Sequence, residues 1–124
     1  MRTWYSAIIL AMKDIGSRNV QLQDIYSVID RYRPLSEHDR EPHPKYPQET
    51  YKHTVRAYLK VLQRHGLVDH VGRAAYSLTP TSIKHLDAFS KDMYGRSSSR
   101  SGKIVALDII ELLSRLGLKK EAID

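Results

Sequence analysis

Residues 51–68 read YKHTVRAYLKVLQRHGLV, and two patterns run through them. Apolar and aromatic residues recur at spacings of three and four, which is the period of a helix with one buried face. Cations recur at every fourth residue: Lys52, Arg56, Lys60 and Arg64. Each step of four advances about 40° around a helix of 3.6 residues per turn, so the cations form a broad slanting stripe. The pattern predicts a helix from about residue 48 to 65 that ends at Gly66.

The residues after Gly66 change to the alternating period of β-strands. LVDHV at 67–71 and AAYSL at 74–78 alternate apolar and polar residues, with Gly72-Arg73 between them. This predicts a two-stranded hairpin with a tight, basic turn. Thr79 followed by Pro80 is typical of an N-cap and a first helical residue, so a helix is expected over 80–94.

Two helices are expected before the proline-rich region. Residues 4–15 and 22–32 have helical periods, ended by Gly16 and before Pro34, and Val20 lies in a very short strand between them. Residues 33–47 hold four of the five prolines and are expected to form a loop with one helical turn at 36–41. The order of elements predicts a mainly α fold with a small β-hairpin, a winged helix-turn-helix plus C-terminal helices.

The end of the chain has a different composition. Residues 95–102, GRSSSRSG, are typical of a linker. Residues 103–117, KIVALDIIELLSRLG, are too apolar to form a helix that stands alone in water. We therefore expect a domain over 1–94, a linker over 95–102 and a C-terminal helix within 103–124. That helix either packs back on the domain or, as we favour, pairs with a copy to form a homodimer.

Composition narrows the class of protein. The 124 residues are 41% hydrophobic and 27% charged, as in one compact globular domain. There is no cysteine, which excludes disulfides and cysteine zinc sites and fits a reducing cytoplasm. No apolar run approaches the ~20 residues of a membrane span, and the amino-terminal residues resemble an amphipathic helix more than a signal peptide.

The charge favours a polyanionic partner. The formal net charge is +6, and residues 48–76 carry five Lys/Arg against two Asp/Glu, which is half of the excess. Nucleic acid is the first candidate, and an anionic membrane surface is the second. The alternative is an ordinary solvated helix face. Glu49 is the only acid within 48–65, however, so the stripe lacks the carboxylates that commonly balance such a face.

A family resemblance rests on five short motifs. They are Val55-Arg56-Ala57-Tyr58-Leu59, His65-Gly66-Leu67-Val68, Gly72-Arg73, Ala75-Tyr76-Ser77-Leu78 and Thr79. With them, residues 50–82 resemble the winged-helix domain at the N-terminus of Mrr-type restriction endonucleases and, more distantly, HARE-HTH modules. The likeness extends loosely over 4–82 and departs in the proline-rich loop. Nothing after residue 95 looks like a nuclease domain, so the resemblance implies DNA binding and not DNA cutting.

In a winged helix, the helix at 48–65 would enter the major groove. The side chains expected near base edges are Gln48, Thr50, Lys52, His53 and Arg56. Lys60 and Arg64 are expected on phosphates, and Arg73 is the residue expected at the tip of the wing. In the loop, Lys45 and Tyr46 could flank a phosphate or stack on a base.

Three functions stay open. The first is a double-stranded DNA-binding protein, either a transcription regulator or the DNA-recognition module of a restriction or defence system. The second is a protein-interaction winged helix that recruits a partner through 103–117, and the weakest is a small nuclease subunit. No catalytic motif appears, and the six histidines show no metal-ligand spacing. We expect no enzyme activity, no cofactor, no metal, and a cytoplasmic protein that is nucleoid-associated when it binds DNA.

Overall fold

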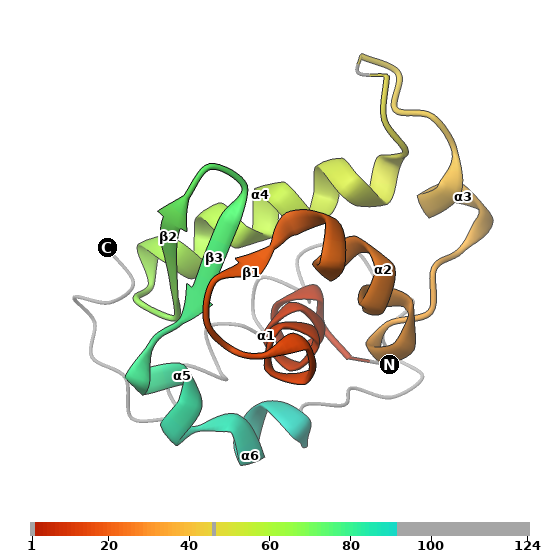
Figure 1. Ribbon diagram of the computed structural model, residues 1–124. Coiled ribbons are helices and arrows are strands. Elements are labelled where there is room, and N and C mark those ends of the chain that lie inside the picture. The colour runs from red at the N-terminus through yellow and green to blue at the C-terminus, as the bar shows by residue number, and fades with distance from the viewer. Residues whose placement is uncertain (1, 46, 92–124) are drawn as a thin grey trace.

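The computed structural model describes residues 2–45 and 47–91 (Figure 1). Helices α1, α2, α3 and α4 span Trp4–Ile15, Leu22–Tyr32, Glu37–Arg40 and Thr50–Arg64. Strands β1, β2 and β3 span Val20–Gln21, Val68–Gly72 and Ala75–Leu78. Two short helices follow, α5 over Pro80–Lys84 and α6 over Leu86–Ser90. The expected mainly α fold with a small β-hairpin is confirmed, while the expected linker and the helix at 103–117 lie outside the described residues.

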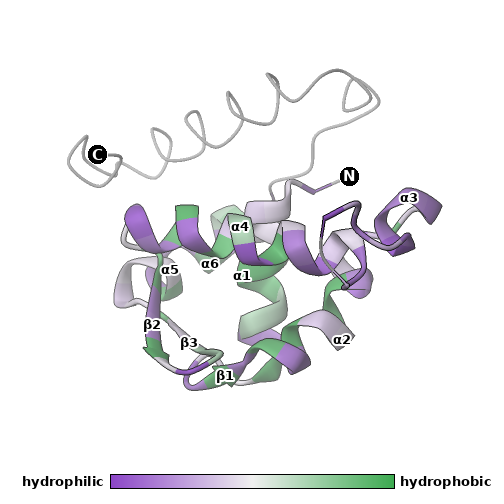
Figure 2. Ribbon diagram, turned by 90° about the horizontal axis from the view of Figure 1, so that it is seen from above, coloured by the Kyte–Doolittle hydropathy of each residue, from purple (hydrophilic) through white to green (hydrophobic). Residues whose placement is uncertain are grey.

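The core forms around α1. Residues Trp4 to Met12 are all buried, because α1 packs against α2, α4, α6 and β3. A helix surrounded in this way can be apolar on every side. Figure 2 shows the contrast with α3, which lies away from the core and is hydrophilic. At the start of α1, the hydroxyl of Thr3 accepts a hydrogen bond from the amide of Ser6 at 3.3 Å.

The expected hairpin forms, and β1 adds a third antiparallel strand to it. The strand order is β1-β3-β2, with Val20 opposite Tyr76. The expected turn at Gly72-Arg73 was wrong by one residue. The register shifts between His70 and Gly72, so Gly72 still pairs with Ala75. The turn therefore falls at Arg73-Ala74, and Ala74 adopts a φ of 57°.

Helix α4 begins two residues later than expected. Glu49 is its N-cap and has an extended backbone, so Gln48 lies in the preceding loop. Both the amide and the hydroxyl of Thr50 donate to the carbonyl of Glu41, at 2.7 and 3.0 Å. A bridge between Pro42 and Glu49 closes the same loop. These contacts fix where the helix starts, and Gly66 ends it with a φ of 75°.

The expectation of one helix over 80–94 was wrong. The chain bends at His85, whose φ of −110° and ψ of 20° separate α5 from α6. The hydroxyls of Thr79 and Ser82 donate to the carbonyls of Gly66 and Leu67, which fixes the direction of α5. The bend then brings Phe89 of α6 into the core, where it is fully buried.

Candidate nucleic-acid interface

The buried side of α4 determines which of its side chains face solvent. Val55, Leu59 and Leu62 are fully buried in the core. Lys60 and Arg64 point away from these residues and are exposed. Neither has a carboxylate partner among residues 2–45 and 47–91. Their two charges are therefore available to an external anion.

A hollow of about 470 Å³ lies between this side of α4 and the sheet. We call it the α4 hollow, and its lining residues are His53, Arg56, Ala57, Lys60, Arg64 and Tyr76. Three of the six are cations and none is acidic. The hollow therefore combines positive charge with an aromatic ring from β3, a combination that suits nucleic acid.

Tyr76 is the part of this hollow that the sequence analysis missed. Its ring stacks on His70 of β2, with centroids 4.6 Å apart and planes at 11°. Burial raises the pKa of Tyr76, while the charge of Arg56 opposes the rise. The alternation of AAYSL could have placed Tyr76 on one face of the sheet. Only the contact of the hairpin with α4 brings that face to the cations (Figure 1).

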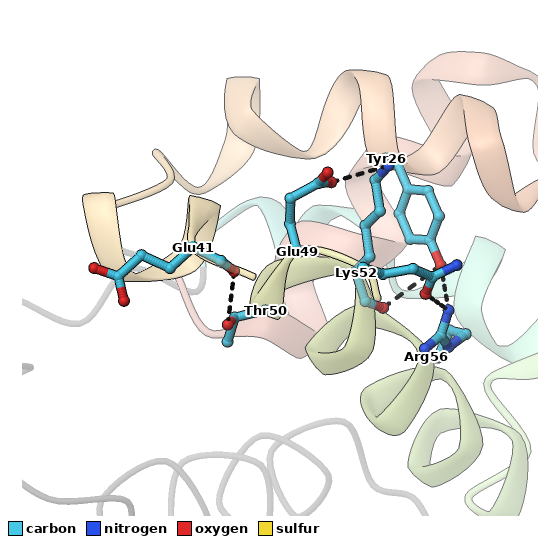
Figure 3. A network of polar contacts seen from close by, with 7 residues as sticks. Tyr26, Glu41, Glu49, Thr50, Lys52 and Arg56 are labelled. Carbon is cyan, nitrogen blue, oxygen red and sulfur yellow. Dashed lines mark hydrogen bonds and ion pairs between the residues drawn. The ribbon is translucent and has the colours of Figure 1, made fainter. Parts of the chain in front are cut away.

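Arg56 is held by two residues from outside α4. Its Nη1 donates to the side-chain oxygen of Gln48 and to the hydroxyl of Tyr26, the latter at 3.5 Å. The same hydroxyl donates to the carbonyl of Lys52, also at 3.5 Å. Figure 3 shows the Tyr26 hydroxyl in contact with both Arg56 and the carbonyl of Lys52. Gln48, predicted as a base contact, supports Arg56 in the free protein.

Lys52 turns toward the protein itself. Its ammonium lies 3.0 Å from the carboxylate of Glu49 and over the rings of Tyr26 and Tyr51. The side chain is 24% exposed, and the hydrogen bond to Glu49 raises the pKa of Lys52. The stripe of four cations is thus divided. Lys52 forms an ion pair with Glu49 beside the core, whereas Lys60 and Arg64 are exposed to solvent.

The loop before α4 brings His43 beside His53 of α4. The rings of His43 and His53 lie 4.5 Å apart, and the amide of Lys45 donates to His43 Nδ1 at 3.0 Å. Loss of solvent lowers the pKa of His43, and the nearby His53, Lys45 and Arg56 act in the same direction. Lys45 is exposed beside this pair. Tyr46 lies outside the described residues.

The remaining predicted residues have separate places. Arg73 is exposed in the turn of the β2–β3 hairpin, which lies against α4. Thr50 uses its hydroxyl to fix the start of α4. The structure thus brings His53, Arg56, Lys60 and Arg64 together in the lining of the α4 hollow, to which Lys52 and Thr50 do not contribute.

Other site types find no support in the described part of the chain. Residues 2–45 and 47–91 contain no cluster of His, Asp and Glu that could bind a metal ion. Of the helices in these ranges, none has the length and hydrophobicity needed to cross a membrane. No family model, curated protein or solved structure matches the chain.

Proposed function

We propose that the protein binds double-stranded DNA through the α4 hollow and the β2–β3 hairpin. The observation that carries the proposal is the pair Lys60 and Arg64, exposed on one side of α4 with no carboxylate partner in the described residues. Two such charges about one helical turn apart match successive phosphates better than a compact ligand. In this proposal α4 enters the major groove, and Arg73 contacts the backbone or the minor groove.

The fold supports this use of α4. A helix-turn-helix protein presents one helix to the major groove while its other helices hold that helix in place. Here the buried face of α4 packs on α1, and the sheet stands at one side of its exposed face. The resemblance of residues 50–82 to Mrr-type winged-helix domains points the same way. The role that follows is a transcription regulator or the DNA-recognition module of a restriction or defence system.

A duplex titration tests the proposal. We expect Lys60→Ala/Arg64→Ala to weaken binding of a labelled duplex at ~50 mM salt by about tenfold or more, because two phosphate contacts are lost. Lys13→Ala/Lys84→Ala removes the same net charge from the exposed ends of α1 and α5 and serves as the matched control. It should bind within about threefold of the parent. Equal losses in both variants, or no binding by the parent, contradict the proposal.

A further inference from the structure

The support of Arg56 distinguishes it from the other two cations that line the α4 hollow. The side chains of Lys60 and Arg64 are exposed and make no hydrogen bond or ion pair within the described residues. Arg56 is only partly exposed, and its Nη1 is held by Gln48 from the loop and Tyr26 from α2. A side chain held from two other elements has already lost the rotamer freedom that binding would otherwise remove.

Tyr26 is itself fixed. It is 5% exposed, and its ring meets Tyr51 edge to face at a centroid distance of 6.0 Å. Its hydroxyl has one proton, which goes to the carbonyl of Lys52 on α4. The oxygen therefore presents its lone pairs to Arg56, and the direction of the contact is set by the backbone of α4.

The contacts with Gln48 and Tyr26 use one nitrogen of a group that has five N–H donors. The donors on Nε and Nη2 have no partner among the described residues, and Arg56 lines the α4 hollow. A guanidinium edge with two parallel donors matches the O6 and N7 acceptors of guanine in the major groove. The same edge also fits two oxygens of a phosphate.

The place of Arg56 favours guanine over phosphate. It lies in the first half of α4, the part of a recognition helix that meets base edges. The exposed cations Lys60 and Arg64 lie further along α4 and serve phosphates, which accept hydrogen bonds from many directions. A held guanidinium gains most where the acceptor has one fixed geometry, as a base edge does. We infer that Gln48 and Tyr26 are positioning residues that hold Arg56 to read a guanine.

This inference rests on the proposed function, and base analogues test it. Selection from random duplexes gives the preferred site of the parent protein. Each guanine in that site is then replaced in turn by 7-deazaguanine, which lacks the N7 acceptor but leaves the phosphates unchanged. We expect one replacement to weaken binding by about tenfold. If Arg56 contacts a phosphate instead, no single replacement weakens binding in this way, and that result overturns the inference.

Variants of the supporting residues separate positioning from folding. In Gln48→Ala and Tyr26→Phe we expect the ratio of affinities for guanine and 7-deazaguanine duplexes to fall to about threefold or less, with circular dichroism unchanged. Gln48→Glu keeps an acceptor for Arg56 and should retain the ratio. Gln63→Ala on α4 and Tyr32→Phe on α2 are the matched controls and should retain it as well.

The two levels of failure are distinguishable. If the parent binds no duplex at any salt concentration, the proposed function and the inference both fail. If the parent binds duplex and Gln48→Ala and Tyr26→Phe keep the full guanine ratio, only the inference fails. An Arg56→Lys variant keeps the charge without the paired donors. It should lose the guanine ratio, and a retained ratio overturns the inference.

Discussion

The ammonium of Lys52 lies 3.0 Å from the carboxylate of Glu49 and 5.4 Å from the centre of the Tyr26 ring. Because of this ion pair, the cations of α4 fall into two groups. Lys52 is paired within the protein, whereas Arg56, Lys60 and Arg64 line the α4 hollow. The proposed DNA contacts therefore rest on Arg56, Lys60 and Arg64 rather than on the whole stripe that the sequence displays.

Removing the Lys52–Glu49 pair tests this division. The double substitution Glu49→Gln/Lys52→Met keeps the net charge and nearly the same side-chain sizes, so we expect duplex affinity to stay within about twofold of the parent. Lys60→Met removes an open charge and should lower the slope of log affinity against log salt by about one. Fluorescence anisotropy titrations measure both. An equal loss in the two variants would show that Lys52 contacts DNA.

The hairpin turn gives a second prediction. Arg73 is exposed between β2 and β3, where it can contact the DNA backbone without reading a base. We expect Arg73→Ala to weaken binding to all duplex sequences by a similar factor, of about threefold to tenfold at ~50 mM salt. Lys84→Ala, on α5, is the control. A loss confined to one duplex sequence would instead give Arg73 a role in base recognition.

Tyr5 predicts a loss of stability at alkaline pH. Burial raises its pKa to about 12, and Tyr58, edge to face at 4.6 Å, acts in the same direction. In the unfolded chain a tyrosine ionises near pH 10. Between about pH 10 and 12 the unfolded state loses this proton first, so the free energy of unfolding falls as pH rises. Urea unfolding measured across this pH interval should show that the free energy of unfolding falls less steeply in Tyr5→Phe than in the parent. Equal falls in the two proteins would show that ionisation of Tyr5 is not the cause.

Phe89 tests whether α6 belongs to the folded domain. Its ring is fully buried, and α6 packs against α1. Phe89→Ala should lower the free energy of unfolding by about 3–5 kcal/mol, as large aromatic truncations in cores do. Ile83 is 43% exposed on α5, so Ile83→Ala should change the free energy of unfolding by less than about 0.5 kcal/mol. A loss of under about 1 kcal/mol for Phe89→Ala would place α6 outside the cooperative unit.

The sequence predicted the elements whose signals are local. The 3.6-residue period and Pro34 placed α2, one helical turn was expected at 36–41 where α3 lies, and Thr79-Pro80 marked the start of α5. The bend at His85 separates α5, whose Thr79 and Ser82 hydroxyls contact the turn after α4, from α6, whose Phe89 is buried in the core. Helical period alone therefore joined α5 and α6 into one helix.

The candidate site was predictable in its charges and not in its contacts. Spacing placed Arg56, Lys60 and Arg64 near one another on α4. The partner that holds Arg56 is Tyr26, 30 residues earlier in the sequence, and the ring that completes the hollow is Tyr76, from β3. Both depend on how α2 and the sheet pack against α4. The sequence alone does not contain that information in any local pattern.

The salt dependence of duplex binding tests the central claim most directly. Affinity for a labelled duplex is measured from ~50 to ~300 mM salt, and log affinity is plotted against log salt concentration. Contacts of Lys60, Arg64 and Arg73 with phosphates predict a slope of about −3, at roughly −0.9 for each phosphate neutralised. The Lys60→Ala/Arg64→Ala variant should bring the slope to about −1. A parent slope near zero, or a slope that the double variant leaves unchanged, would contradict DNA binding through this side of α4.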